Sequence, residues 1–368
     1  MNIEFLHVLD EQAKLKYARD FRYSNSLEEF INEYDIKLKL TQKVYICEVL
    51  VPKNNYNLHV STNIEKELRY IPSYVKEAVN NYQALLVFNL NEISHYNTYT
   101  KDYELCISMI RDAGLNPRNI RILTMSDTAS YWTNAWHIYL METRNSTLVN
   151  EINLNPRDKI FTCLNRFQKH HRRYIVSELI NNNLHTKSYV SYSSKKYAKF
   201  DQNDYGNPYS HISDYTQIDN LIPLVIDDMS DTDHNNHSIV VHEYFNNAYW
   251  NIVTESLESS EGCVLTEKTF KPIANLQPFI LVGGYQTLKQ LRKLGFKTFG
   301  NIIDEGYDTI KDNTERMKAV MKEIKRLGNM SHEEHITLMR CISPVLIHNK
   351  NHFLSKPALI KYLTRILR

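Results

Sequence analysis

The sequence predicts an α/β protein made of two Rossmann-like domains and a C-terminal helix. Three observations predict this class. Short apolar runs typical of buried strands alternate with segments of helical periodicity. The chain has 368 residues, enough for two domains of ordinary size, and its hydrophobic share of 42% supports packed cores. A polar segment, residues 144–158, separates two stretches that share this alternation.

The first half contains three expected strands and one expected helix. Residues 44–51 (VYICEVLV) and 84–90 (ALLVFNL) predict buried strands. Residues 102–114 predict a helix that Gly114 can end, and a turn then leads into a third strand, 120–125 (IRILTM). The apolar stripe of this helix comprises Leu105, Met109 and Ala113.

The second half repeats the alternation. Residues 159–164 (KIFTCL) predict a strand, and residues 171–183 predict the helix that follows it. Residues 187–215, rich in Ser, Tyr, Lys and Asn, are expected to form a long irregular excursion. Apolar and aromatic residues return over 239–253, and residues 278–282 (PFILV) predict a last buried strand that runs into two glycines.

The chain ends in an expected amphipathic helix. It covers residues 356–367 and follows Ser355, a suitable cap, with a proline in its first turn. The predicted parts are therefore a first domain, residues 1–150, a second domain, residues 151–345, and a terminal helix that packs back, residues 346–368.

Composition excludes several classes of protein. Lys+Arg 44 against Asp+Glu 42 gives a net charge of +2, so no global field draws the chain onto nucleic acid. The cysteines are five and widely spaced, which argues against a disulfide scaffold. The first residues lack the apolar core of a signal peptide, and no apolar run is long enough to span a membrane. We expect a cytoplasmic protein, in the host cytoplasm if the Asn-, Lys- and Tyr-rich usage reflects a virus.

The triplet Thr266-Glu267-Lys268 has the form of a ligand-binding helix start. Thr266 can cap the helix, and a carboxylate in the first turn can accept both hydroxyls of a ribose. Lys268 and free backbone N–H groups can face a diphosphate. An acid, Glu255, follows the preceding apolar run, and the next strand ends in Gly-Gly, so these segments should share one sheet edge. The alternative is an ordinary capped helix.

A second cluster follows the strand that ends near Asn165. It contains Arg166 and Arg172, whose forked and permanently charged donors suit phosphate, so at least one of them is expected to contact it. The alternative is a solvated basic helix start. The adjacent histidines are expected to be structural, because no acid or histidine follows at a metal-ligand spacing.

At these motifs, residues 161–299 resemble the nucleotide-binding half of the α1,3-fucosyltransferase family and its fucosyltransferase-like relatives. In that family a strand ending in Ser-Asn is followed by an Arg, then by Phe-Glu-Asn-Ser and by Tyr-Val-Thr-Glu-Lys. The corresponding segments here are Leu164-Asn165 with Arg172, Thr254-Glu255-Ser256 and Val264-Leu265-Thr266-Glu267-Lys268. Val264 stands where the family has Tyr and Ser256 where it has Asn, so donor base and sugar stay open.

The resemblance implies a GT-B fold, in which two Rossmann-like domains face a cleft. It implies that Glu267 holds the ribose and that Lys268 and Arg172 hold the diphosphate of a nucleotide-sugar donor. The expected donor-binding set is completed by Asn165, Arg166, Glu255 and Thr266. Transfer would be inverting and independent of metal, with the nucleotide sugar as co-substrate and no other cofactor.

Inverting transfer needs a base, in the first domain, that deprotonates the acceptor hydroxyl. Three acids lie at or just beyond expected strand ends: Glu48, Glu92 and Asp127. We predict Asp127 and Glu92 as the catalytic candidates. The alternative, a helix cap or a surface acid, is the one that the sequence favours for each of them.

Other patterns keep other functions open. The acids of Asp227-Asp228-Met-Ser-Asp231-Thr-Asp233 match the metal-binding pattern of GT-A enzymes, or form an exposed polar loop. Residues 187–199 mix Lys with Tyr, which suits contact with a nucleic-acid backbone and stacking on bases, or form a solvated loop, which the sequence favours. A viral origin would make a hydroxymethylated DNA base the alternative acceptor to a glycan. A non-catalytic nucleotide- or glycan-binding protein, or a nucleic-acid-binding module, are the non-enzyme alternatives.

Overall fold

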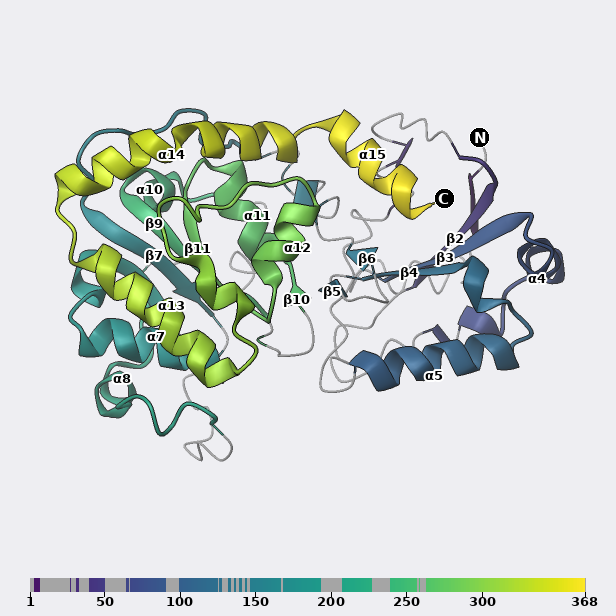
Figure 1. Ribbon diagram of the computed structural model, residues 1–368, viewed down its shortest axis with the longest axis horizontal. Coiled ribbons are helices and arrows are strands. Elements are labelled where there is room, and N and C mark those ends of the chain that lie inside the picture. The colour runs from purple at the N-terminus through teal and green to yellow at the C-terminus, as the bar shows by residue number, and fades with distance from the viewer. Residues whose placement is uncertain are drawn as a thin grey trace. The chain divides into compact units, whose positions relative to one another are not determined.

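The computed structural model describes two compact parts of the chain (Figure 1). The described residues are 3–6, 27, 31–32, 40–49, 64–65, 67–90, 99–124, 126–127, 132–133, 136, 139–140, 143, 146–166, 168–192, 207–226, 239–256, 258 and 263–367. The first unit combines Met1–Glu142 with Ser355–Arg368, and the second is Thr143–Leu354. The borders expected from the sequence lay at residues 150 and 345, and the latter falls inside a continuous helix, His332–Phe353.

The first unit holds a five-stranded sheet whose described strands are all parallel. In spatial order these are β1 (Ile3–Leu6), β2 (Lys43–Val49), β3 (Ala84–Leu90), β4 (Ile120–Thr124) and β6 (Trp132–Thr133). The order follows the chain, so this described sheet has no point at which the strand order reverses. A further two-residue strand, β5, covers Ser126–Asp127. The expected strands are confirmed over 44–49, 84–90 and 120–124, and residues 50, 51 and 125 lie outside the described residues.

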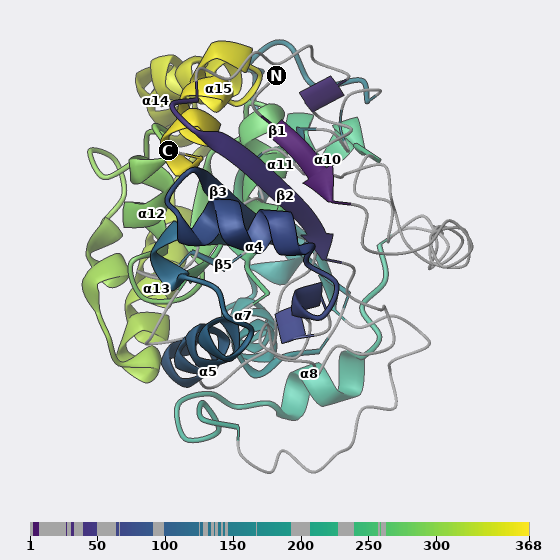
Figure 2. The ribbon, with the colours of Figure 1, turned by 90° about the vertical axis from the view of Figure 1, so that its right-hand side faces the viewer.

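Helices α4 (Ser73–Asn80) and α5 (Tyr99–Asp112) cover one face of this sheet (Figure 2). Register places Tyr45 beside Leu86, and Leu86 beside Ile120, so alternate side chains of three strands form one apolar surface. The helices pack Val75, Val79, Cys106 and Ile110 into this cluster. Both helices lie on one face because consecutive right-handed crossovers in one direction place their helices on the same side.

The second unit contains a four-stranded parallel sheet with a reversal in strand order. The spatial order is β11 (Phe279–Val282), β9 (Ala248–Thr254), β7 (Lys159–Asn165) and β8 (Ser188–Tyr192). From β7 the chain goes first to β8 on one side and then to β9 on the other. The β7–β9 boundary is therefore a topological switch point, the place where open α/β sheets bind ligands.

Helices lie on both faces of this sheet, which gives three layers (Figure 1). Helix α13 (Asn313–Gly328) contacts α7 (His170–Asn181), β7 and β11, whereas α14 (His332–Phe353) contacts α11 (Glu267–Ala274). The remaining elements of the unit are η3 (His185–Lys187), α8 (Thr216–Leu221), α10 (His242–Asn246), β10 (Cys263–Val264), α12 (Thr287–Lys293) and η5 (Glu305–Thr309).

One expected loop begins with regular structure. Residues 187–215 were expected to be irregular, but β8 occupies Ser188–Tyr192 and pairs with β7 along its whole length. Its side chains alternate between buried and partly exposed, which is the period of a strand. The prediction was wrong over these five residues because it was based on their polar composition and not on this alternation.

The C-terminal helix, α15 (Lys356–Ile366), belongs to the first unit. Leu359, Leu363 and Ile366 are fully buried, and the Tyr362 ring packs against Trp136 with centroids 6.1 Å apart. Ser355 caps this helix as predicted, since its side chain accepts a hydrogen bond from the Ala358 amide. A short helix, η2 (Pro117–Asn119), precedes β4. Across the described residues, every helix is too short or too polar to cross a membrane.

Candidate functional site at the switch point of the second unit

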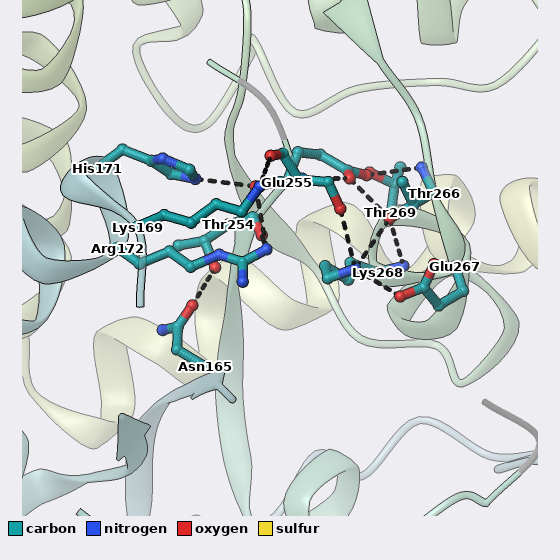
Figure 3. Close-up of polar contacts among 11 residues, drawn as sticks. Asn165, Lys169, His171, Arg172, Thr254, Glu255, Thr266, Glu267, Lys268 and Thr269 are labelled. Carbon is teal, nitrogen blue, oxygen red and sulfur yellow. Dashed lines mark hydrogen bonds and ion pairs between the residues drawn. The ribbon is translucent and has the colours of Figure 1, made fainter. Parts of the chain in front are cut away.

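Polar side chains join the carboxyl ends of β7 and β9 at the switch point (Figure 3). The Thr254 hydroxyl donates a 2.5 Å hydrogen bond to Asn165 Oδ1, and the backbone N–H of Asn165 donates to Ser191 Oγ on β8 at 3.2 Å. Asn165 and Thr254 are buried. Asn165, predicted from sequence as a donor-binding residue, thus lies at the sheet edge where a ligand is expected, and its bonds tie the strand ends together.

The Glu255 carboxylate is completely buried and accepts four hydrogen bonds. Oε1 accepts from the Thr266 amide at 2.9 Å and the Thr269 hydroxyl at 2.5 Å, and Oε2 accepts from the Thr266 hydroxyl at 2.7 Å and the Ser256 amide at 3.2 Å. Its charge also lies at the positive N-terminus of α11. Glu255 therefore fixes the start of α11 to the end of β9, a positioning role where the sequence had predicted donor contact.

The predicted cap at Thr266 is confirmed. Its hydroxyl accepts from the Lys268 amide at 3.3 Å while donating to Glu255, so one side chain connects the helix start to the buried carboxylate. Lys268 Nζ lies 2.5 Å from Glu267 Oε1 and 3.3 Å from Ser256 Oγ. The Lys268 side chain is 32% exposed to solvent. The helix start thus presents a carboxylate and an ammonium group beside each other.

Side chains in the first turn of α7 form hydrogen bonds with the backbone at the end of β9. Arg172 is buried, and its Nη2 donates to the carbonyls of Thr254 and Glu255, both at 3.3 Å. His171 Nε2 contacts the Glu255 carbonyl at 2.9 Å, and its Nδ1 lies 3.1 Å from Glu258 Oε2. These two bonds of Arg172 go to backbone carbonyls, and its contact with phosphate stays a prediction. The expectation that this histidine is structural agrees with its packing.

Lys169 is a site residue that sequence reasoning did not select. It is the N-cap residue of α7, and its Nζ donates to the Ser256 carbonyl at 2.7 Å. Burial, followed by the charges of Arg172 and Lys268, lowers the pKa of Lys169 to about 7, and Glu258 opposes this shift. The sequence signal that could have identified Lys169 is its position between the end of a strand and the start of a helix.

The remaining predicted residues have little or no described structure. Arg166 directly follows β7 and is partly buried, and its phosphate role stays a prediction. Asp127 lies in β5 with only its backbone described, as does Glu48 in β2. Glu92 and the acidic run 227–233 lie outside the described residues. Within the described part of the chain, no three acidic, His or Cys side chains are grouped to hold a metal ion.

Comparisons with known proteins return no relative. A scan against protein-family models finds no match, and searches of curated proteins and of solved structures find none either. The fucosyltransferase-like resemblance therefore rests on the sequence motifs alone. Those motifs belong to the segments that hydrogen bonds join at the switch point.

Proposed function

We propose that this protein is a glycosyltransferase that moves a sugar from a nucleotide-sugar donor to a hydroxyl acceptor, most simply on a glycan. The main support is the convergence of three segments, 165–172, 254–256 and 266–268, at one end of a parallel sheet. They meet at a switch point, beside two helix N-termini. That position in an α/β sheet suits the phosphates of a nucleotide.

Each part of the donor has a proposed partner. Glu267 accepts the ribose hydroxyls, because it lies in the first turn of α11 and its side chain is 15% exposed. Lys268, beside it, neutralises the diphosphate. Glu255 acts through Thr266 by fixing the helix start that carries both groups.

The proposed chemistry is an inverting displacement. The acceptor oxygen attacks the anomeric carbon, the bond from that carbon to the diphosphate oxygen breaks, and the acceptor proton passes to a base. Asp127 or Glu92, in the first unit, is the proposed base. Negative charge grows on the departing diphosphate, and the lysine and arginine side chains near the switch point stabilise it without a metal ion.

A thermal-unfolding screen with nucleoside diphosphates and nucleotide sugars tests this proposal. A ligand present at 100 times its Kd stabilises the folded state by about 2.7 kcal/mol, which a shift in Tm reveals. We expect a donor nucleotide to raise Tm and Glu267→Ala to abolish that rise. Glu315→Ala is the matched control, since Glu315 lies in the first turn of α13 and is exposed.

Turnover of the stabilising nucleotide sugar then separates an enzyme from a binding protein. Release of nucleoside diphosphate in the presence of a hydroxyl acceptor is the expected result. If no nucleotide changes the Tm of the wild-type chain, the proposed function is wrong. An unchanged shift in Glu267→Ala would remove Glu267 from the donor site.

A further inference from the structure

Two lysines from different helices meet at Ser256. Lys169 reaches it from the N-cap of α7 and donates to its carbonyl at 2.7 Å. Lys268 reaches it from the first turn of α11 and contacts its hydroxyl oxygen at 3.3 Å. Ser256 is the second residue after β9, so both ammonium groups lie at the carboxyl end of a strand at the switch point (Figure 3).

The charged and titratable groups around Lys169 come from three elements. They include His171 and Arg172 on α7, Glu255 and Glu258 after β9, and Glu267 and Lys268 on α11. Each acid in this set already has strong partners. Glu255 accepts four hydrogen bonds, Glu258 faces His171, and Glu267 faces Lys268.

The environment of Lys169 is unfavourable for a positive charge until an anion arrives. Burial and two neighbouring cations, Arg172 and Lys268, lower its pKa to about 7. An anion placed between two ammonium groups reverses the electrostatic part of this effect. A diphosphate has oxygens enough to accept from both lysines at once.

We propose that Lys169 and Lys268 form a two-lysine clamp for a diphosphate above Ser256, and that Lys169 takes up a proton from solvent as the diphosphate binds. Lys268 was expected from the sequence, and Lys169 is the new member. No covalent bond changes, since the proton joins the neutral amine to give an ammonium group. The claim that this anion is part of a nucleotide sugar rests on the proposed function.

The proposal fixes the direction of a pH effect. In the free protein Lys169 loses its proton as pH rises through about 7. The bound anion raises this pKa, so affinity is greatest below pH 7 and falls as pH rises until the pKa of the complex is reached. Within that window the loss approaches about tenfold per pH unit, the limit for one linked proton.

Calorimetric titration of the full chain with inorganic pyrophosphate tests the clamp. Measuring each binding enthalpy in two buffers of different ionisation enthalpy gives the number of protons taken up. At pH 7.5 we expect the wild-type protein to take up about 0.7 proton more than Lys169→Arg, whose guanidinium stays charged. Protons exchanged by pyrophosphate itself are common to both proteins and cancel in the difference.

Affinity gives a second readout. Lys169→Met removes the charge and keeps an unbranched apolar side chain, so we expect pyrophosphate affinity at pH 6.5 to fall about tenfold or more. Lys169→Arg should retain affinity and lose the additional pH dependence. Lys318→Met is the matched control, because Lys318 is exposed on α13, and it should bind as the wild type does.

The outcomes separate this inference from the proposed function. Equal proton uptake by wild type and Lys169→Arg, or equal affinity of wild type and Lys169→Met, would overturn the clamp. If pyrophosphate gives the expected differences and no nucleotide binds more tightly than pyrophosphate, the clamp stands and the nucleotide-sugar function fails. If a nucleotide binds with the same proton uptake in wild type and Lys169→Arg, the function stands and the clamp fails.

Discussion

At the scale of single residues, the buried carboxylate of Glu255 is the central group of the site. A charge removed from water is costly unless hydrogen bonds replace its hydration, and Glu255 accepts four of them. Two of the donors belong to Thr266, the residue that caps α11. One carboxylate therefore sets the position of the helix start that carries Glu267 and Lys268.

Replacing this carboxylate should weaken both the fold and the site. Glu255→Gln keeps the shape but turns one acceptor into a donor, which faces other donors. We expect the free energy of unfolding of the second unit to fall by about 1–3 kcal/mol, measured by urea denaturation. Glu315→Gln, an exposed acid at a helix start, should change it by less than about 0.5 kcal/mol. Equal stability of the two variants would contradict the positioning role.

Features of the site that depend on neighbours in sequence were predictable, whereas contacts that form only when distant segments fold together were not. Thr266 as a cap follows from its own neighbours in sequence, because capping needs only the next few residues. Three residues donate the four hydrogen bonds to Glu255, and two of them, Thr266 and Thr269, reach it only when α11 folds back onto β9. The lowered pKa of Lys169 comes first from burial and then from the charges of Arg172 and Lys268, and both the burial and the Lys268 charge arise only in the folded chain.

At the scale of elements, β8 is one of the two edge strands of the described sheet in the second unit, and it supports the end of β7. Its Ser191 hydroxyl accepts a hydrogen bond from the backbone N–H of Asn165, so the strand contacts the site directly. Ser188, Val190 and Tyr192 point inward and are buried. The element is therefore part of the core, although its composition is that of a loop.

Truncation of a buried side chain of β8 tests this assignment. Val190→Ala should lower the free energy of unfolding by about 1–3 kcal/mol, because it removes buried methyl groups and leaves a cavity. Val225→Ala makes the same chemical change at a side chain that is 48% exposed, and should cost less than about 0.5 kcal/mol. Denaturant unfolding of both variants provides the comparison. Similar losses at both positions would mean that Val190 is not in the core.

Helical periodicity found α5 but misjudged which side of it is buried. The predicted stripe began with Leu105, which is 47% exposed, whereas Cys106 and Ile110 are fully buried. Met109 and Ala113 pack only partly against the core. Apolar residues at adjacent positions widen the apolar face, so the sequence leaves the rotation of the helix ambiguous. Packing against β3 and β4 decides it.

At the scale of the whole molecule, the first unit is assembled from both ends of the described chain. Its sheet comes from residues before Glu142, and α15 comes from residues after Leu354. The second unit is one continuous segment between them. Local composition marked the polar segment near the first border. The second border was expected at residue 345, which lies inside α14, whereas it falls between Leu354 and Ser355, just after that helix.

This division predicts which unit is destabilised by a substitution in α15. Leu363→Ala removes a fully buried side chain and should cost about 2–5 kcal/mol. Hydrogen exchange should rise in β2 and β3 of the first unit and stay unchanged in β7 and β9 of the second. Leu354→Ala alters a side chain that is 42% exposed and is the matched control. Faster exchange confined to the second unit would contradict the assignment of α15.

The discontinuous first unit also has a consequence for synthesis on the ribosome. About two hundred residues of the second unit are translated after the β-strands of the first unit and before α15. At 5–20 residues per second this interval lasts about 10–40 s. During it the nascent sheet lacks the apolar side chains of α15, while the continuous second unit has all of its own. We expect the later-encoded unit to complete its fold first, and the earlier-encoded one to stay incomplete until α15 has been translated.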